Sequence, residues 1–398
     1  MSADEIKRLA SNEVQEFLSL HEKDDEQQLL LKHKTILGIP AALIAQQLAG
    51  RRRAKDKLPL FYATKGIVYP PSLNLEQSSS DVTARFKTEV IGREIVSKAI
   101  KGADLTGGFG IDSFFLSKAV GSIDFVEPNQ ELLYLARHNH HLLGINIQYY
   151  NQTAEEFLAT TSSHDLIYID PSRRDSKARK VSSLKDCSPN VTSLLPDLFD
   201  KADFILIKAS PLLDLKQGIL ELSGVKKVFV VSVENDCKEL LFFLQKGFAS
   251  RPSIETYNLD AEGKIKHSFH FTFEQEEEAI SEFSPPQEYL YEPNASVLKA
   301  GAFKLVGGHF GLKKLHVNTH FYTSEVFQNN FPGRVFKIES DFDVANLPDR
   351  KANIITRNYP LSPDELKKKF KLKDGGENFV IGLSGQKKKH LLVAKRLA

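Results

Sequence analysis

The sequence predicts an α/β fold: a doubly wound parallel sheet, preceded by a helical region and followed by a small α+β domain. Three observations lead to this prediction. From residue 103 onward, short apolar strands alternate with helical segments. A glycine-rich turn at 106–110 separates the first of these strands from the first helix. An acidic run at 274–278 and a proline pair at 285–286 mark a boundary in a chain long enough, at 398 residues, for two or three domains.

Composition excludes several classes of protein. Hydrophobic residues make up 41% and charged residues 26% of the chain, which is typical of a globular protein and excludes a fully disordered one. No apolar run approaches the ~20 residues of a membrane span. The first residues show no basic and apolar secretory signal. Cys187 and Cys237 are too few for a disulfide framework, which favours reduced thiols and a cytoplasmic location.

Residues 1–75 are expected to be mostly helical, with Pro40 starting a helix that runs into Arg51–Arg53. A further helix is expected to begin within 78–81, where Ser and Asp residues favour an N-cap. In the following region, 76–280, strands are predicted at 103–105, 123–127, 146–150, 165–170, 204–208 and 228–233, with helices at 111–119, 130–143, 154–159, 191–199 and 212–222 between them.

The end of this region departs from the simple alternation. We expect a helix over 239–246, followed by strands at 253–258 and 267–273, the last of them antiparallel. The remaining residues, 281–398, read as a separate domain. Asn294 can cap a helix, Ser362 to Glu365 form a capping box, and strands are predicted at 335–339, 353–356, 379–383 and 390–394. The order β-β-α-β-β predicts a small α+β domain.

The glycine-rich turn follows the first strand, at the edge of the sheet where such folds bind ligands. It lacks the third glycine of a dinucleotide site and the Gly-Lys-Ser/Thr ending of a phosphate loop. S-adenosylmethionine fits better, because an acid after the first strand suits its ammonium and an acid after the second suits its ribose hydroxyls. An ordinary βα turn with surface acids is the alternative. The predicted cofactor-binding residues here are Asp104, Thr106, Gly107, Gly108, Gly110, Glu127, Asn129, Ala154 and Glu155.

A second motif, Asp170-Pro171-Ser172-Arg173, ends the fourth strand. With it, the chain resembles class I S-adenosylmethionine-dependent methyltransferases, and more narrowly the bacterial ones that carry a C-terminal THUMP-like domain. The resemblance covers the chain from about residue 76 to its end. It implies a Rossmann-like domain, followed by a THUMP-like, ferredoxin-like α+β domain, and a methyltransferase activity.

The resemblance also implies roles for the residues of this motif. Its position is that of the Asp/Asn-Pro-Pro-aromatic motif of enzymes that methylate exocyclic amines, with Ser172 and Arg173 as departures. We expect Asp170 to be catalytic and, with Pro171, to contact the cofactor. Arg173 and Arg174 are expected to bind substrate, since an arginine plane can stack on a base.

Two other methylation reactions use recognisable residues. Carbon-5 methylation of pyrimidines is disfavoured because Val233 stands where related enzymes have their cysteine, and Cys237, placed in the following helix, is expected to be inert. The strand-end residues Asp170, Lys208 and Glu234, with Lys87 before the first strand, resemble the tetrad of ribose 2′-O-methyltransferases. We expect Lys208 to take part in catalysis and Lys87 to bind substrate, and we favour a base nitrogen over ribose as the target.

Histidines carry no predicted site. His138, His140 and His141 fall in one helix, and without an evident carboxylate partner they are interpreted as a solvated helix face. No metal is predicted.

Basic clusters point to the partner. Residues 361–398 hold ten Lys or Arg and four Asp or Glu, and further clusters lie at 51–53 and 173–180. Because THUMP domains bind RNA, the resemblance implies a structured RNA, tRNA or rRNA. The lack of a long apolar run predicts no membrane partner. A methyltransferase of a small molecule or protein, and a non-catalytic RNA-binding factor that retains a cofactor pocket, are the alternatives. The sequence predicts no oligomeric state.

Overall fold

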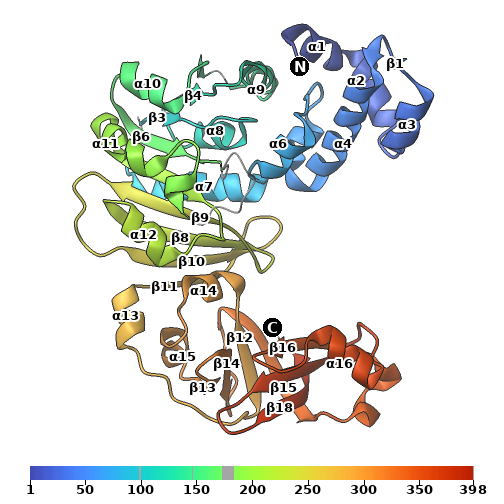
Figure 1. The fold of residues 1–398 in the computed structure, drawn as a ribbon, viewed down its shortest axis with the longest axis vertical. Coiled ribbons are helices and arrows are strands. Elements are labelled where there is room, and N and C mark those ends of the chain that lie inside the picture. Colours follow the sequence, from blue (N-terminus) through green and yellow to red (C-terminus); the bar gives the residue numbers. More distant parts are fainter. Residues whose placement is uncertain (98–99, 146, 173–182, 398) are drawn as a thin grey trace. The chain divides into compact units, whose positions relative to one another are not determined.

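The structure is a computed structural model that describes residues 1–97, 100–145, 147–172 and 183–397 (Figure 1). The predicted residues Arg173 and Arg174 therefore lie outside the described residues. The chain forms two compact units. The first comprises Met1–Lys226 with Leu241–Ser250, and the second Lys227–Leu240 with the chain from Arg251 onward.

The first unit begins with short helices, as predicted. Pro40 precedes the long helix α4, and a small hairpin, β1–β2, lies just before it. Buried residues of these helices, Leu48 and Phe61 among them, share one hydrophobic core with Phe109 and Phe114 of the region that follows. The elements are α1 (Ala3–Leu9), α2 (Asn12–Leu20), α3 (Glu26–Lys32), β1 (Thr35–Ile36), β2 (Ile39–Pro40), α4 (Ala41–Lys57), α5 (Pro59–Ala63) and α6 (Ser72–Gln77).

A parallel sheet forms the centre of the first unit and confirms the predicted doubly wound fold. Starting from β9 (Asp236–Gln245), its order is β9-β7-β6-β3-β4-β5, and β3, β4, β5, β6 and β7 pair in parallel. The chain winds from β3 to β4 and β5 on one side, then returns to β6 and β7 on the other, so the switch point lies between β3 and β6. The strands are β3 (Lys101–Asp104), β4 (Ser122–Val126), β5 (Gln148–Tyr150), β6 (His164–Ile169) and β7 (Ala202–Ala209).

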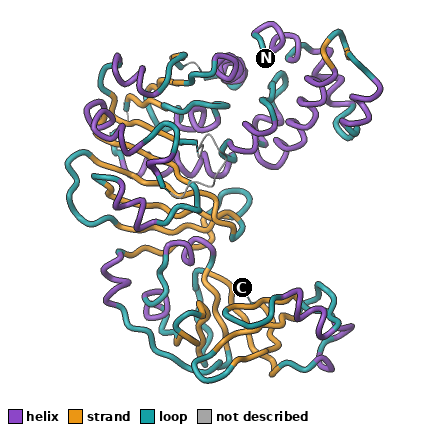
Figure 2. Tube along the Cα trace, in the orientation of Figure 1, coloured by secondary structure: helices purple, strands orange, loops and turns teal. Residues whose placement is uncertain are grey.

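Helices flank these strands, as Figure 2 shows in purple and orange. Ser80 caps the helix before β3 through a capping box, as the run of Ser and Asp predicts. The helices of this part are α7 (Asp81–Glu94), α8 (Ile111–Leu116), α9 (Gln130–Leu142), α10 (Ala154–Thr160), α11 (Val191–Lys201) and α12 (Leu215–Glu221), with the 3-10 turn η1 (Leu184–Asp186).

The helix predicted over 239–246 is wrong: these residues belong to the strand β9 (Asp236–Gln245), which follows β8 (Val225–Val233). Glu234 and Asn235 both have positive φ, the backbone of a tight two-residue hairpin turn. The apolar run at 240–244 is fully buried, and such a run suits a buried strand as well as a helix. Cys237 thus lies in a strand, not in a helix.

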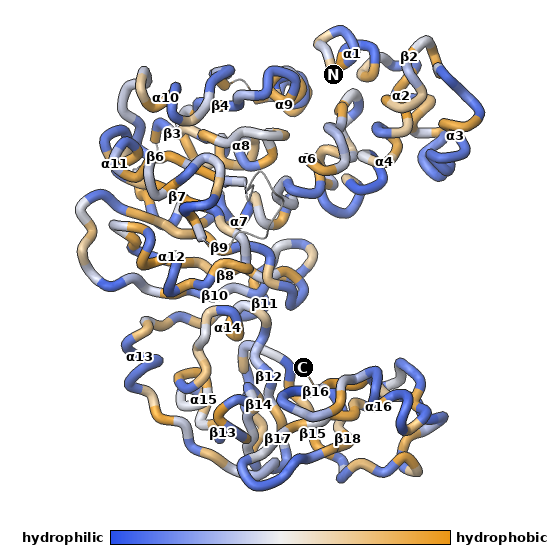
Figure 3. Tube along the Cα trace, in the orientation of Figure 1, coloured by the Kyte–Doolittle hydropathy of each residue, from blue (hydrophilic) through white to orange (hydrophobic). Residues whose placement is uncertain are grey.

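The second unit contains the predicted antiparallel ending. Strand β10 (Ser253–Leu259) pairs in parallel with β8 and antiparallel with β11 (Ile265–Phe271), and the short helix α13 (Phe273–Glu278) follows. The residues Leu240–Leu244 and the strands of both units are rich in hydrophobic residues, coloured orange in Figure 3.

Among the described residues, no helix combines the length and the apolar character needed to cross a membrane.

A seven-stranded sheet completes the second unit, in the order β13-β14-β12-β15-β18-β17-β16. The predicted caps of Asn294 and Ser362 are confirmed, whereas β12, β13 and β14 were not predicted. The elements are β12 (Tyr289–Pro293), α14 (Ala295–Ala300), α15 (Leu305–His309), β13 (Lys313–His316), β14 (Thr319–Ser324), β15 (Gly333–Asp341), η2 (Val344–Asn346), η3 (Pro348–Arg350), β16 (Asn353–Arg357), α16 (Pro363–Phe370), β17 (Asn378–Ser384) and β18 (Lys389–Arg396).

Candidate active site

The glycine-rich turn connects β3 to α8, where the sequence places it. Gly108 and Gly110 have φ of 54° and 86°, a left-handed backbone that favours glycine. The N–H of Gly107 donates to the carbonyl of Val126 at 2.9 Å, and that of Gly110 donates to the carbonyl of Gly107 at 2.8 Å. The turn is therefore bonded both to itself and to the end of β4.

The three glycines serve different purposes. A Cβ on Gly107 would lie 2.4 Å from the ring of Phe125, and one on Gly110 would lie 2.5 Å from Nε2 of His140. Both positions need glycine because protein atoms pack directly against the backbone. At Gly108 a Cβ would meet only the carbonyl oxygen of Thr106, at 3.8 Å. Gly108 is thus the position where the turn leaves open space over its backbone.

Glu127 follows β4 and is held in one orientation. One carboxylate oxygen accepts the N–H of Gly108 and the other accepts the N–H of Asn129, each at 2.8 Å. Burial raises the pKa of Glu127, while the two backbone hydrogen bonds oppose the rise. Each carboxylate oxygen keeps lone pairs for further donors. Asn129 itself caps α9 through its side-chain oxygen, which accepts from Glu131 and Leu132.

Asp104 ends β3 and is almost fully buried, with 1% of its surface exposed. Its carboxylate accepts the N–H of Thr106 at 3.0 Å and the hydroxyl of Ser113. Burial raises the pKa of Asp104 to about 7, although both hydrogen bonds oppose it. In the structure Asp104 supports the turn from inside, and its contact with a cofactor ammonium stays a prediction.

Asp170 and Lys208 come together at the switch point. The N–H of Asp170 donates to the hydroxyl oxygen of Thr106 at 2.7 Å, which ties the end of β6 to the glycine turn. The ammonium of Lys208, near the end of β7, forms an ion pair with the carboxylate of Asp170. The Asp170 side chain is 30% exposed and that of Lys208 14%. The two predicted catalytic residues thus form one partly exposed pair beside the turn.

Lys87 has a different position from the one expected. It is fully buried in α7, and its ammonium lies 3.2 Å from the carboxylate of Asp112, in the first turn of α8. The same carboxylate accepts hydrogen bonds from Ser79 at 2.7 Å and from Tyr168 at 3.0 Å. This burial does not agree with the substrate-binding role predicted for Lys87.

Asp112 is a site residue that the sequence analysis missed. Although burial opposes the change, the ammonium groups of Lys87 and Lys208 lower the pKa of Asp112. Lys208 thus acts on two carboxylates, those of Asp112 and Asp170. Its place in the first turn after the glycines was the only available signal.

His140 corrects the prediction of a solvated histidine face. The ring is fully buried, and Nε2 lies 2.8 Å from the carbonyl oxygen of Gly110, which can only accept, so Nε2 carries the proton. Burial lowers the pKa of His140 to about 4, against the effect of that hydrogen bond, so the ring is neutral at pH 7. The helical spacing of Leu133, Ala136 and His140 was the signal for its buried face.

The other predicted residues are more dispersed. Ala154 is buried at the start of α10, Glu155 is exposed beside it, and Pro171 is buried directly after Asp170. Glu234, the last member of the ribose tetrad, belongs to the second unit, where it pairs with Lys266 at 2.8 Å. Burial raises the pKa of the Cys237 thiol to about 12, which agrees with an unreactive cysteine. The described residues include no His, Cys, Asp and Glu cluster able to hold a metal.

Comparison with solved structures defines the class of this fold. A crystal structure of a predicted methyltransferase from Porphyromonas gingivalis W83 is 33% identical, with a TM-score of 0.84, over 96% of this chain and 97% of that one. A predicted RNA methyltransferase from Pyrococcus horikoshii matches 48% of this chain and 98% of its own at 15% identity, with a TM-score of 0.36.

Two family models match the second unit: a ferredoxin-like domain over residues 289–332 and a THUMP domain-like region over residues 333–396. No significant match was found among curated proteins. With its doubly wound sheet and its glycine turn at the switch point, the chain has the class I methyltransferase fold. It belongs to the same family as the Porphyromonas protein, methyltransferases with a C-terminal THUMP-like domain.

The raised pKa of Asp104 predicts a specific dependence of stability on pH. Between pH 4 and pH 7 the folded state keeps a proton on Asp104 that the unfolded chain releases, so this group makes the protein less stable as pH rises. In Asp104→Asn, the side-chain amide can still form hydrogen bonds with Thr106 and Ser113, but it has no proton that titrates in this pH range. From pH 5 to pH 7, the free energy of unfolding should therefore fall by about 2 kcal/mol more in the native protein than in the variant.

Urea denaturation at each pH measures this difference. The matched control is Asp200→Asn, which changes an exposed aspartate of α11 and should leave the pH profile as in the native protein. Parallel profiles for the native protein and Asp104→Asn would show that Asp104 has no raised pKa.

Proposed function

We propose that this protein is an S-adenosylmethionine-dependent methyltransferase that acts on a structured RNA, tRNA or rRNA, at a base nitrogen rather than at a ribose hydroxyl. The observation that carries the proposal is the meeting of Asp170, Lys208 and the glycine turn through Thr106. The family relationship supports methyl transfer. The choice of cofactor, substrate and atom rests on the residues described in the following paragraphs.

The residues around the turn fit S-adenosylmethionine, which supplies an electrophilic methyl group when bound. Gly108 leaves space over its backbone, and Glu127 is held so that its remaining lone pairs can accept hydroxyl groups such as those of a ribose. Asp112 and Asp170 offset the ammonium groups of Lys87 and Lys208, and Asp104 adds a buried carboxyl group whose pKa the other two carboxylates help to raise. A site without an excess of positive charge suits a cationic ligand better than a phosphate-bearing dinucleotide.

The ion pair favours a base nitrogen over ribose. A carboxylate beside an ammonium stabilises the charged forms of both groups, so Lys208 is poorly placed to remove a proton from a ribose hydroxyl. Asp170 keeps acceptor capacity for an amino group, and a hydrogen bond from that group would orient the nitrogen toward the turn. The burial of Lys87 also leaves the ribose tetrad without one member at the surface.

Exposed lysines of the second unit support an RNA partner. Lys368 and Lys369 lie on α16, and Lys387, Lys388 and Lys389 lie at the turn between β17 and β18, all exposed. They belong to the THUMP-like region, and THUMP domains bind RNA. The cluster at 51–53 is different, because each arginine pairs with a glutamate: Arg51 with Glu22, Arg52 with Glu26 and Arg53 with Glu76. The positive charge of this cluster is therefore paired with glutamates of the first unit.

Gly107→Ala and Gly108→Ala form a matched pair that tests the cofactor site. Gly107→Ala should destabilise the fold by about 1–3 kcal/mol, because its Cβ meets Phe125. Gly108→Ala meets no such clash and should cost about 1–2 kcal/mol for its left-handed backbone. At a temperature where both variants are folded, Gly108→Ala should weaken S-adenosylmethionine binding at least tenfold in calorimetry. Normal binding by Gly108→Ala would contradict the placement of the cofactor.

Asp170→Ala and Lys208→Ala test the chemistry. Asp170→Ala should lower turnover about a hundredfold or more, with cofactor affinity little changed. If a base nitrogen is methylated, Lys208→Ala should mainly weaken substrate binding, since the lone pair of the base attacks without a lysine base. Turnover of bulk RNA with labelled cofactor, followed by mass spectrometry of the nucleosides, measures both effects.

The control for these variants is Asp200→Ala, an exposed carboxylate of the same unit that should leave turnover unchanged. A Lys208→Ala protein that binds RNA and cofactor normally but is inactive would favour the ribose route. An unaffected Asp170→Ala turnover, or the absence of any methylated RNA, would contradict the proposed activity.

The lysines of the THUMP-like region give a test of RNA binding. The double change Lys387→Glu and Lys388→Glu should weaken binding of bulk tRNA. A plot of the logarithm of the binding constant against the logarithm of the salt concentration should also become less steep. Its slope should change by about 0.7–0.9 for each phosphate that the protein no longer neutralises. Lys238→Glu with Lys264→Glu alters the same charge at exposed positions elsewhere in the unit and should have a smaller effect. Equal effects of the two pairs would show that only net charge matters.

A further inference from the structure

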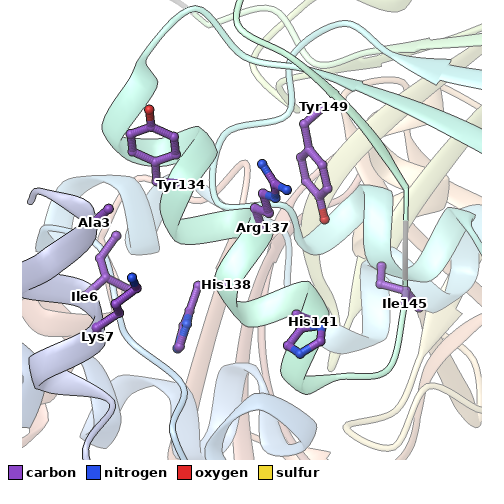
Figure 4. A pocket seen from close by; sticks show the side chains of 9 residues that line it. All are labelled: Ala3, Ile6, Lys7, Tyr134, Arg137, His138, His141, Ile145 and Tyr149. Carbon is purple, nitrogen blue, oxygen red and sulfur yellow. The ribbon is translucent and has the colours of Figure 1, made fainter.

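A cleft of about 590 Å³ opens in the first unit between α1 and α9 (Figure 4). This volume falls within the range of about 300–1,000 Å³ found for small-molecule sites. Its walls come from two segments that are far apart in the sequence: Ala3, Ile6 and Lys7 from α1, and Tyr134, Arg137, His138, His141, Ile145 and Tyr149 from α9 and the chain after it. None of these residues belongs to the site described above.

The charge of the cleft is of one sign. Two of the nine lining side chains, Lys7 and Arg137, are cations, His138 and His141 add imidazole rings, and none of the nine is acidic. Nε2 of His138 lies 3.0 Å from the carbonyl oxygen of Gly66. In Figure 4 Lys7 approaches His138 from the opposite wall, and the Arg137 guanidinium points toward Tyr149. Basic groups that lie far apart in the sequence thus line one space. Such a lining attracts an anion.

The remaining lining is aromatic and apolar. Tyr134 is 37% exposed. The guanidinium of Arg137 lies 5.8 Å from the centre of the Tyr149 ring. Ile6 and Ile145 supply apolar surface. A ligand that suits this cleft therefore combines a planar, weakly polar group with an anionic one, because tyrosine and arginine planes stack on bases and cations bind phosphate.

We propose that this cleft binds a phosphorylated nucleotide, with its phosphate on Lys7 and Arg137 and its base against Tyr134 and Tyr149. An RNA strand and a free nucleoside monophosphate present the same chemistry to the cleft, and the two sources are distinguished by experiment. This site goes beyond the proposed methyl transfer and does not depend on it.

The cleft is connected to the glycine turn by two hydrogen bonds. The hydroxyl of Tyr149 donates to Nδ1 of His140 at 3.0 Å, since Nε2 of this neutral ring holds the proton that bonds Gly110. An occupant of the cleft that contacts Tyr149 therefore lies two hydrogen bonds from the backbone of the turn. By thermodynamic reciprocity, the factor by which the occupant changes the affinity for the cofactor equals the factor by which the cofactor changes the affinity for the occupant.

Binding of uridine 5′-monophosphate and of a single-stranded oligouridylate to the full chain tests the proposal. Both are measured by calorimetry or fluorescence anisotropy with saturating S-adenosylhomocysteine, so that a nucleotide cannot occupy the cofactor position. Arg137→Ala and Tyr134→Ala are each expected to weaken binding of at least one probe tenfold or more. Uridine without phosphate should bind at least tenfold more weakly than its monophosphate.

Lys7→Ala tests the lysine of the cleft, and Lys34→Ala is its matched control. Lys34 is an exposed lysine of the same unit that does not line the cleft. If the cleft variants lose only oligouridylate binding, the natural ligand of the cleft is an RNA strand. If they lose monophosphate binding, the ligand is a free nucleotide. Failure of both probes to bind, or affinities that are the same in Arg137→Ala, Tyr134→Ala and Lys34→Ala, would overturn the proposal. The methyl-transfer proposal is tested by turnover, not by binding to this cleft, so its failure is recognised separately.

Discussion

One hydrogen bond holds together the two halves of the candidate site: the N–H of Asp170 donates to the hydroxyl of Thr106 at 2.7 Å. The chain leaves β3 and β6 toward opposite sides of the sheet, as it must at a switch point, so connectivity alone does not keep the two following loops together. The side chain of Thr106 spans this gap. The carboxylate of Asp170 therefore lies beside the glycine turn.

Several elements support the glycine turn. Phe125 of β4 packs against Gly107, His140 of α9 bonds Gly110, and Glu127 accepts the N–H of Gly108. The N-terminal helices join this support, because the ring of Phe61 lies 5.8 Å from that of Phe109. Residues 1–75 thus form part of the core behind the turn, and a change in these helices is expected to reach the site through packing.

The two ion pairs near the turn differ in how deeply they are buried. Lys87 and Asp112 form an inner pair in which the lysine is fully buried and the aspartate is 11% exposed, while Lys208 and Asp170 form an outer pair that is more exposed. The inner pair is costly to bury and fixes the start of α8 against α7. The outer pair retains lone pairs and exposure, which are the properties required of groups that meet a substrate.

Much of this architecture follows from the sequence by itself. Alternating apolar strands and helices, the glycine turn and the caps of Ser80, Asn294 and Ser362 are local signals, so the order of elements and the position of the turn were predictable. Asp104, Glu127, Asp170 and Lys208 were predictable as strand-end residues for the same reason. The strand β9 was mistaken for a helix because a short apolar run fits both periods, and the hairpin turn at Glu234 and Asn235 has no strong signature.

Only the tertiary structure decided which of these residues meet. Lys87 pairs with Asp112 and not with Asp170 because α7 and α8 bury the two residues side by side, and a buried ammonium is costly unless a carboxylate offsets its charge. His140 is held inside because α9 lies against the glycine turn, whereas its neighbours His138 and His141 line a cleft with Lys7. Such pairings depend on contacts between residues far apart in the chain, and the sequence records the types of these residues but not their distances.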